Sequence, residues 1–159
     1  MMLQSSTKRT QALGSAGVIT SAGHSYLNTV ERVVVDDITK VGAFVQSNAN
    51  ANEAINASGS AISGSILGVV VKDELRSYAT DTALTAKGSN QTVIVTGNVL
   101  IETSLVANQG QYVFLKTADG TLGFADTKTL TDYTYTGWRV EVGNATAVAG
   151  IIEITTSRG

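Results

Sequence analysis

The feature that most constrains the fold is a succession of short, β-branched apolar runs, separated by turn-forming residues about every 8–12 residues. Several runs alternate apolar and polar residues with the period of two that a half-buried strand requires. Val, Ile, Thr and the aromatic residues make up 58 of the 159 residues, and these types suit a pleated surface. The sequence therefore predicts an all-β fold, a compact antiparallel barrel or sandwich of about nine short strands, and not βαβ units.

The runs also give expected strand limits. The expected strands lie at residues 17–20, 30–35, 41–46, 66–71, 91–96, 99–103, 111–116, 121–124, 138–142 and 149–155. Gly97-Asn98 predicts a two-residue hairpin between two of these runs, and Asp119-Gly120 predicts a second hairpin. Gly68, inside an apolar run, predicts a bulge or a close approach of two backbones.

Three segments are less regular. Residues 47–61 (SNANANEAINASGSA) predict a surface loop, with a short helix over 52–57 as the alternative. Residues 72–79 allow two helical turns, and residues 81–90 predict a loop. Residues 1–16 are polar and without periodicity, so we expect a flexible N-terminal arm followed by a single β domain over residues 17–159.

Composition excludes several classes of function. Eleven Lys and Arg against 13 Asp and Glu give a net charge of −2, which argues against a nucleic-acid partner. The chain has no cysteine, and His24 is its one histidine, so thiol chemistry and sites with two imidazoles are excluded. No nucleotide-binding, hydrolase or metal-ligand motif is present, so we expect no enzyme, no cofactor and no metal site. No apolar run is long enough to span a membrane, and residues 1–17 lack the apolar run of a secretory signal, so we expect synthesis in a cytoplasm and no membrane partner.

Two sets of residues are candidate binding sites. Lys8 and Arg9 lie in the arm, where they can meet an acidic surface, and Asn48, Asn50 and Asn52 lie in a segment long enough to be a contact surface. The alternation of residues 138–142 places Trp138, Val140 and Val142 on one face. Trp138 is then a core residue, or, together with Tyr133 and Tyr135, a stacking platform for a sugar or another small ligand.

The order of these features resembles the capsid cement, or head-decoration, proteins of tailed bacteriophages. Residues 64–71 (GSILGVVV) are similar to a family strand that follows a small-residue stretch, and residues 137–154 (GWRVEVGNATAVAGIIEI) are similar to its closing strand pair. The resemblance covers residues 15–155. The chain departs from the family pattern in the polar arm before residue 15 and in the Asn-rich residues 47–56.

The resemblance implies a structural virion protein, made in the host cytoplasm, that binds the outer surface of the capsid and stabilises the mature shell by bridging capsomers. The implied partner is the major capsid protein, and the implied assembly is a homo-oligomer, with a trimer as one form, or a symmetric array on the shell. Lys8, Arg9, Asn48, Asn50 and Asn52 become candidate capsid contacts. The alternative function is a tail adhesin or carbohydrate-binding β module that uses Tyr133, Tyr135 and Trp138.

Overall fold

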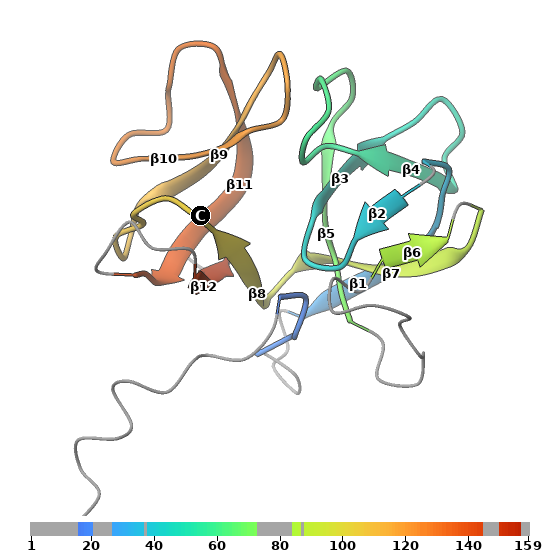
Figure 1. The fold of residues 1–159 in the computed structure, drawn as a ribbon, viewed down its shortest axis with the longest axis horizontal. Helices are drawn as coiled ribbons and strands as arrows, with labels where there is room; N and C mark the ends of the chain where they lie inside the picture. Colours follow the sequence, from blue (N-terminus) through green and yellow to red (C-terminus); the bar gives the residue numbers. More distant parts are fainter. Residues whose placement is uncertain are drawn as a thin grey trace, which may run out of the picture.

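The fold consists of β-strands in three sheets (Figure 1). The computed structural model describes residues 16–20, 27–36, 38–72, 84–86, 88–144 and 150–156. The twelve strands in these ranges are β1 (Asn28–Val34), β2 (Ile38–Lys40), β3 (Phe44–Ser47), β4 (Glu53–Asn56), β5 (Ile66–Val70), β6 (Leu84–Ala86), β7 (Asn90–Thr96), β8 (Asn98–Thr103), β9 (Tyr112–Lys116), β10 (Leu122–Ala125), β11 (Tyr133–Val142) and β12 (Gly150–Thr155). The all-β prediction is confirmed.

The first half of the chain forms a closed five-stranded barrel in the order β1-β4-β3-β5-β7. Its pairs are antiparallel, except that β1 and β4 run parallel through Val33–Glu53 and Val34–Ala54. A separate ladder joins β2 and β6. Closure leaves the barrel without the free edges that an open sheet of short apolar strands would expose.

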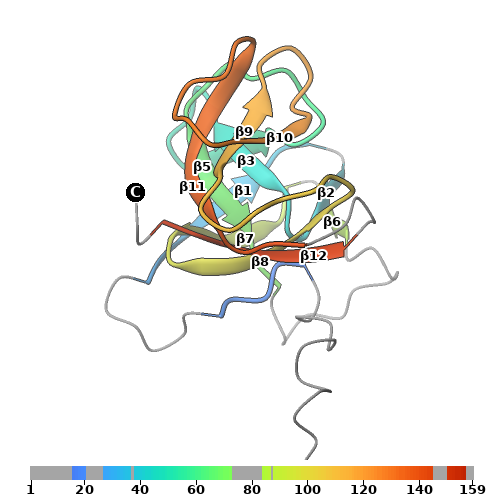
Figure 2. The same cartoon turned by 90° about the vertical axis from the view of Figure 1, so that its left-hand side faces the viewer.

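The second half forms an antiparallel five-stranded sheet in the order β10-β9-β11-β12-β8. The long strand β11 connects its two parts, because it pairs with β9 from Tyr133 and with β12 toward Val142 (Figure 2). Residues 16–20 lie beside β8, where Gly17 N–H donates to the Leu100 carbonyl and Leu100 N–H donates to the Val18 carbonyl. The expected strand at 17–20 is thus a short extension of this sheet, with one β-bridge between Ile19 and Val99.

The apolar core has two parts. Val45, Ala54, Val70 and Val93, one from each of β3, β4, β5 and β7, pack together with Val41 inside the barrel. A larger cluster lies between the barrel and the five-stranded sheet and takes side chains from both. At its centre the Phe44 and Trp138 rings meet edge-on, with centroids 6.4 Å apart. The two sheets share this core. The single β domain over residues 17–159 and its boundary at residue 16 remain predictions.

The loop between β4 and β5, residues 57–65, holds the two sheets together at one end of the molecule. Gly59 N–H donates to the Gly120 carbonyl at 3.3 Å, and Ile62 N–H donates to the Thr117 carbonyl at 2.9 Å. Gly120 sits in the turn between β9 and β10 with φ +70°, and a Cβ there would collide with the loop backbone. The predicted Asp119-Gly120 hairpin is confirmed, with Leu122 paired to Leu115.

The hairpin predicted at Gly97-Asn98 is wrong. β7 pairs with β1 and β5, whereas β8 pairs with β12, so the two strands belong to different sheets. Gly97, at φ 135°, carries the chain from the barrel to the sheet. A Gly-Asn pair favours a tight turn only locally, and both flanking runs are apolar enough to be buried in separate sheets.

Two predicted loops contain strands. In the segment 47–61, residues 53–56 form β4 and not a surface loop or a short helix, because Ala54 is fully buried inside the barrel and pairs with Ser47 and Val34. In the segment 81–90, residues 84–86 form β6 against β2. The helical turns predicted at residues 72–79 cannot be compared, because residues 73–79 lie outside the described residues.

The remaining predictions concern single positions. Gly68 makes the predicted close backbone approach: a Cβ there would overlap the Ile94 carbonyl oxygen and lie 2.9 Å from its carbon. Trp138 and Val140 are buried as expected, but Val142 is 40% exposed. The pairing of β11 with β12 shifts register between Val140 and Val142, so Val142 leaves the buried face.

Candidate functional site

Acidic side chains are dispersed in the described part of the chain. No three His, Cys, Asp or Glu side chains gather there as a metal site would require. His24 lies outside the described residues. Among the described residues, no helix has the length and apolar character needed to cross a membrane.

The candidate contacts Asn48, Asn50 and Asn52 share the turn between β3 and β4. Asn50 and Asn52 are exposed, whereas Asn48 is half-buried and donates from Nδ2 to the Glu53 carboxylate at 2.8 Å. The turn is held through its backbone, since Val33 N–H donates to the Asn52 carbonyl at 2.9 Å. The two exposed amides therefore extend from a fixed backbone into solvent.

The other two candidate contacts, Lys8 and Arg9, lie outside the described residues. Downstream of them, Thr20 adds a backbone bond to Asn98 and a hydroxyl bond to the Glu153 carboxylate at 2.7 Å. Lys72 N–H donates to the Gly17 carbonyl, which ties the same segment to the barrel. Within the described residues 16–20, backbone bonds thus attach the chain both to the five-stranded sheet and to the barrel.

Three large apolar side chains are exposed where the β8–β9 loop runs beside the end of β11. Leu105, Val106 and Val142 are 42%, 41% and 40% exposed, and we call them the apolar edge. Their two segments run side by side, joined by an Ala107–Asn144 bridge and by a bond from Asn144 Nδ2 to the Leu105 carbonyl at 3.0 Å. Exposed apolar area of this kind is typical of a contact surface.

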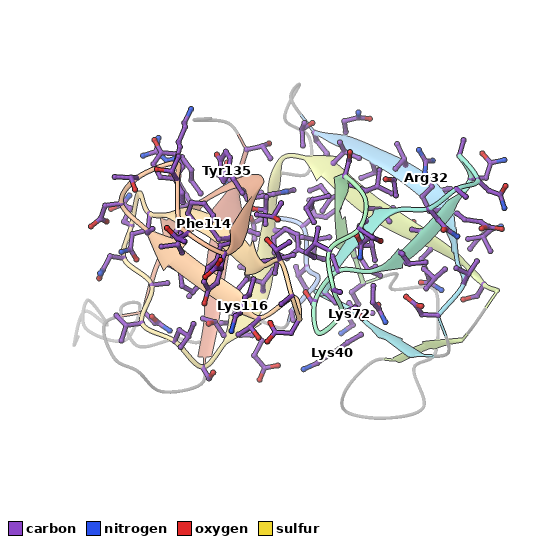
Figure 3. The ribbon with its side chains drawn as sticks, turned by 90° about the horizontal axis from the view of Figure 1, so that it is seen from above. Arg32, Lys40, Lys72, Phe114, Lys116 and Tyr135 are labelled. Atoms are coloured by element: carbon purple, nitrogen blue, oxygen red, sulfur yellow. The ribbon has the colours of Figure 1, made fainter. Side chains whose placement is uncertain are left out.

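An aromatic groove lies on the face of the five-stranded sheet that points away from the core. Phe114 and Tyr135, from β9 and β11, lie together on this face (Figure 3), with ring centroids 5.6 Å apart. The loop of residues 126–132 folds over them and leaves a groove of about 320 Å³. The groove is lined by Phe114, Lys128, Thr129, Leu130, Thr131, Tyr133 and Tyr135.

The structure separates the three residues of the predicted stacking platform. Tyr133 and Tyr135 line the groove, but Trp138 lies on the opposite face of β11, 2% exposed and packed on Phe44. The alternative in which Trp138 is a core residue is therefore the one that the structure favours. Tryptophan fluorescence accordingly reports on the core and not on ligand in the groove.

Tyr112 and Phe114 join Tyr133 and Tyr135 on this face, and the sequence did not lead us to expect them there. The Tyr112 ring meets Tyr135 edge-on at 5.6 Å and carries the Arg139 guanidinium 4.7 Å from its centre. The run QYVFLK contained a signal, because its alternation places Tyr112 and Phe114 on one face of the strand. The Thr and Asp content of residues 126–132 predicts a loop, but no pattern indicates that this loop folds over the sheet.

The groove is electrostatically mild. Burial, reinforced by Tyr112 and opposed by Arg139, raises the pKa of Tyr135, so its hydroxyl is protonated and able to donate at neutral pH. The covering loop carries Asp126, Lys128 and Asp132, a net charge of −1. The groove thus presents aromatic faces and neutral hydroxyls more than charge.

Comparison with known proteins gives a family match and a likeness of fold. A family model described as "Structural cement protein (E217 gp24/Pam3 gp6)" matches residues 3–157. Among solved structures, the chain is similar to a chain in "The capsid of Myoviridae Phage XM1", with a TM-score of 0.59 and 15% identity over 89% of each chain. At that identity the likeness concerns the fold alone. The curated proteins contain no match to the chain.

Proposed function

The chain belongs to the phage structural cement protein family, and from this membership we propose that it binds the outer surface of a tailed-phage capsid and stabilises the mature shell by bridging capsomers. Membership makes the chain a structural, non-enzymatic component of the virion capsid, as the resemblance implied. The match over residues 3–157 is the observation that carries the proposal, since it spans almost the whole chain. The proposed partner is the major capsid protein.

The arrangement of exposed surfaces supports bridging. The β3–β4 turn with Asn50 and Asn52 belongs to the barrel, whereas the apolar edge belongs to the five-stranded sheet, on the other side of the shared core. A stable contact needs about 800 Å² per partner, roughly a tenth of the accessible surface of 8966 Å². One copy therefore has room for two separate capsomer contacts, with a rigid connection between them.

Avidity would then strengthen attachment. A copy that engages two capsomers makes its second contact at high effective concentration, so each single contact needs only modest affinity. We propose that copies occupy the shell as a homo-oligomer, such as a trimer at threefold positions, or as an array set by the shell symmetry. Co-sedimentation of the protein with purified mature heads tests the function: we expect saturable binding at a fixed number of copies per capsomer, and equal binding to unrelated protein shells would contradict it.

Removal of residues 1–12 should weaken binding to heads without unfolding the protein. The deletion takes away the proposed contacts Lys8 and Arg9 but keeps the backbone bonds that begin at Gly17. We expect a clear loss of co-sedimentation and a melting temperature within about 2 °C of the full chain, since surface changes alter stability little. A truncated protein that melts far below the full chain would show instead that the arm is part of the fold.

Replacement of both exposed turn amides should also weaken binding. Asn50→Ala with Asn52→Ala removes two side chains and leaves the backbone bonds of the turn in place. With one hydrogen bond of about 1 kcal/mol lost from each of the two amides, we expect roughly thirtyfold weaker binding to heads. The matched control is Asn90→Ala, an exposed amide on β7 outside the turn, which should bind as the wild type does. Equal binding by the double variant would remove the turn from the contact.

A further inference from the structure

We propose that the aromatic groove binds a neutral oligosaccharide of pyranose units, a function separate from attachment to the capsid. The three tyrosines among the described residues, Tyr112, Tyr133 and Tyr135, all lie on this one face of the sheet. The other face of the same strands supplies Val113, Leu115 and Trp138 to the core. The aromatic face is thus additional to what folding of the sheet requires.

The shape of the groove suits sugar rings. Its volume of about 320 Å³ lies at the lower end of the range for small-ligand sites. Phe114, 1% exposed, lies beneath it, and Tyr133 and Tyr135 form its sides. The Tyr133 ring packs against Gly123 of β10, where an added Cβ would come within 2.7 Å of the ring. Flat aromatic surfaces of this kind pack on the C–H faces of pyranose rings while the tyrosine hydroxyl stays available for a hydrogen bond.

Polar groups are placed at the rim. Thr129, Thr131 and the Lys128 ammonium line the groove from the covering loop. Hydroxyls and a single ammonium are suited to the hydroxyl groups of a sugar, which donate and accept. Asp126 and Asp132 flank Lys128 in the covering loop, so the loop carries a net charge of −1 and offers an anionic ligand no net attraction.

The covering loop is held in place before any ligand arrives. The Thr127 hydroxyl donates to the Thr129 carbonyl at 3.0 Å, and Tyr133 N–H donates to the Leu130 carbonyl at 3.2 Å. At its far end, Thr117 N–H donates to the Asp132 carbonyl at 2.9 Å, which fixes the loop to the β9–β10 turn. A site formed in advance loses little conformational entropy on binding, which favours a shallow groove with few contacts.

The test is saturation-transfer NMR on the full chain, with maltotetraose, cellotetraose and N-acetylchitotetraose as probes. We expect saturable binding of at least one of the three. Tyr135→Ala should weaken it about tenfold or more, whereas Tyr135→Phe, which keeps the ring, should weaken it less. Because Tyr135 packs on Phe114, the exposed pair Lys128→Ala with Thr129→Ala provides a second test that does not depend on internal packing.

Trp138 emission, which arises in the core, checks that each variant is folded. The control is Leu105→Ala, at the apolar edge, which should leave sugar binding unchanged. Failure of all three sugars to bind the wild type would overturn the proposal, as would binding that both groove variants retain in full. If the groove instead bound an acidic peptide and none of the sugars, the oligosaccharide proposal would be overturned, and the groove would be a protein-docking site. Co-sedimentation of the groove variants with heads should match the wild type, so this test and that of the capsid function fail independently.

Discussion

Replacement of Gln46 with methionine should lower the free energy of unfolding by about 3–5 kcal/mol, a loss of roughly 10 °C in melting temperature. Gln46 lies on β3, fully buried beneath the β4–β5 loop. Its Nε2 donates to the carbonyls of Asn56 and Ala61 at 2.8 and 2.9 Å, and its Oε1 accepts from the N–H groups of Ser63 and Gly64 at 2.8 Å each. Methionine keeps the length of the side chain but removes the amide that bonds to all four of these backbone groups.

The loss of stability in Gln46→Met should extend beyond the barrel, because the β4–β5 loop is also bonded to the β9–β10 turn through Gly59 and Ile62. Hydrogen exchange of these two amides should accelerate together in the variant. The matched control is Gln109→Met, an exposed glutamine whose replacement should change stability by less than about 0.5 kcal/mol. Equal stability of the two variants in urea unfolding would show that water satisfies the loop as well as Gln46 does.

A side chain at position 68 should damage the barrel still more directly. The Cβ of Gly68→Ala would overlap the Ile94 carbonyl oxygen and lie 3.1 Å from a methyl of Val93, so β5 and β7 would have to separate. These strands pair through Val69–Ile94 and Val70–Val93, next to the site of the overlap. Because backbone cannot move aside as a flexible side chain can, we expect a loss of about 3 kcal/mol or more, or no folded protein.

Gly59→Ala is the control for Gly68→Ala. It replaces a glycine without causing a steric overlap, so it measures only the cost of losing a glycine's backbone freedom. Gly59 has φ +77° and no atom near its missing Cβ, so the variant incurs only left-handed strain, about 1–2 kcal/mol. We expect Gly68→Ala to be clearly the less stable of the two in thermal unfolding. The reverse order would mean that the β5–β7 contact is loose in solution.

Sequence patterns correctly predicted the features that depend on residues close together in the chain. The Asp119-Gly120 turn forms as expected, because Gly120 supplies the positive φ and the Asp119 carboxylate accepts from the hydroxyl and N–H of Thr121 at 2.7 and 3.0 Å. These two hydrogen bonds lower the pKa of Asp119, and the bond from the Thr121 hydroxyl has the larger effect. The alternation of β11 likewise placed Trp138 and Val140 in the core. In each case the residues that decide the outcome are within a few positions of one another.

Contacts between distant segments account for the errors. The pairing of β8 with β12, over 50 residues downstream, overrides the turn signal at Gly97-Asn98. β4 exists because Val34 and Ser47 pair with Ala54 from two sides, which the small polar residues around it do not indicate. The groove depends on a loop that returns over β9, so the sequence predicted Tyr133 and Tyr135 but neither Phe114 nor the cover.

The functional prediction succeeded by a different route. No motif carries a reaction, and the family was identified from the order of β segments, notably residues 64–71 and 137–154. The family match over residues 3–157 confirms that resemblance. The candidate capsid contacts stay predictions: Lys8, Arg9, Asn48, Asn50 and Asn52. The deletion of residues 1–12 tests the two basic residues, and the double alanine variant tests the exposed amides of the β3–β4 turn.

The most direct test of the capsid function is a cryo-EM reconstruction of mature heads saturated with the protein. We expect density on the outer surface that spans the boundary between neighbouring capsomers, with the barrel on one side and the five-stranded sheet on the other. Density confined to a single capsomer, to the inner surface of the shell or to the tail would contradict bridging.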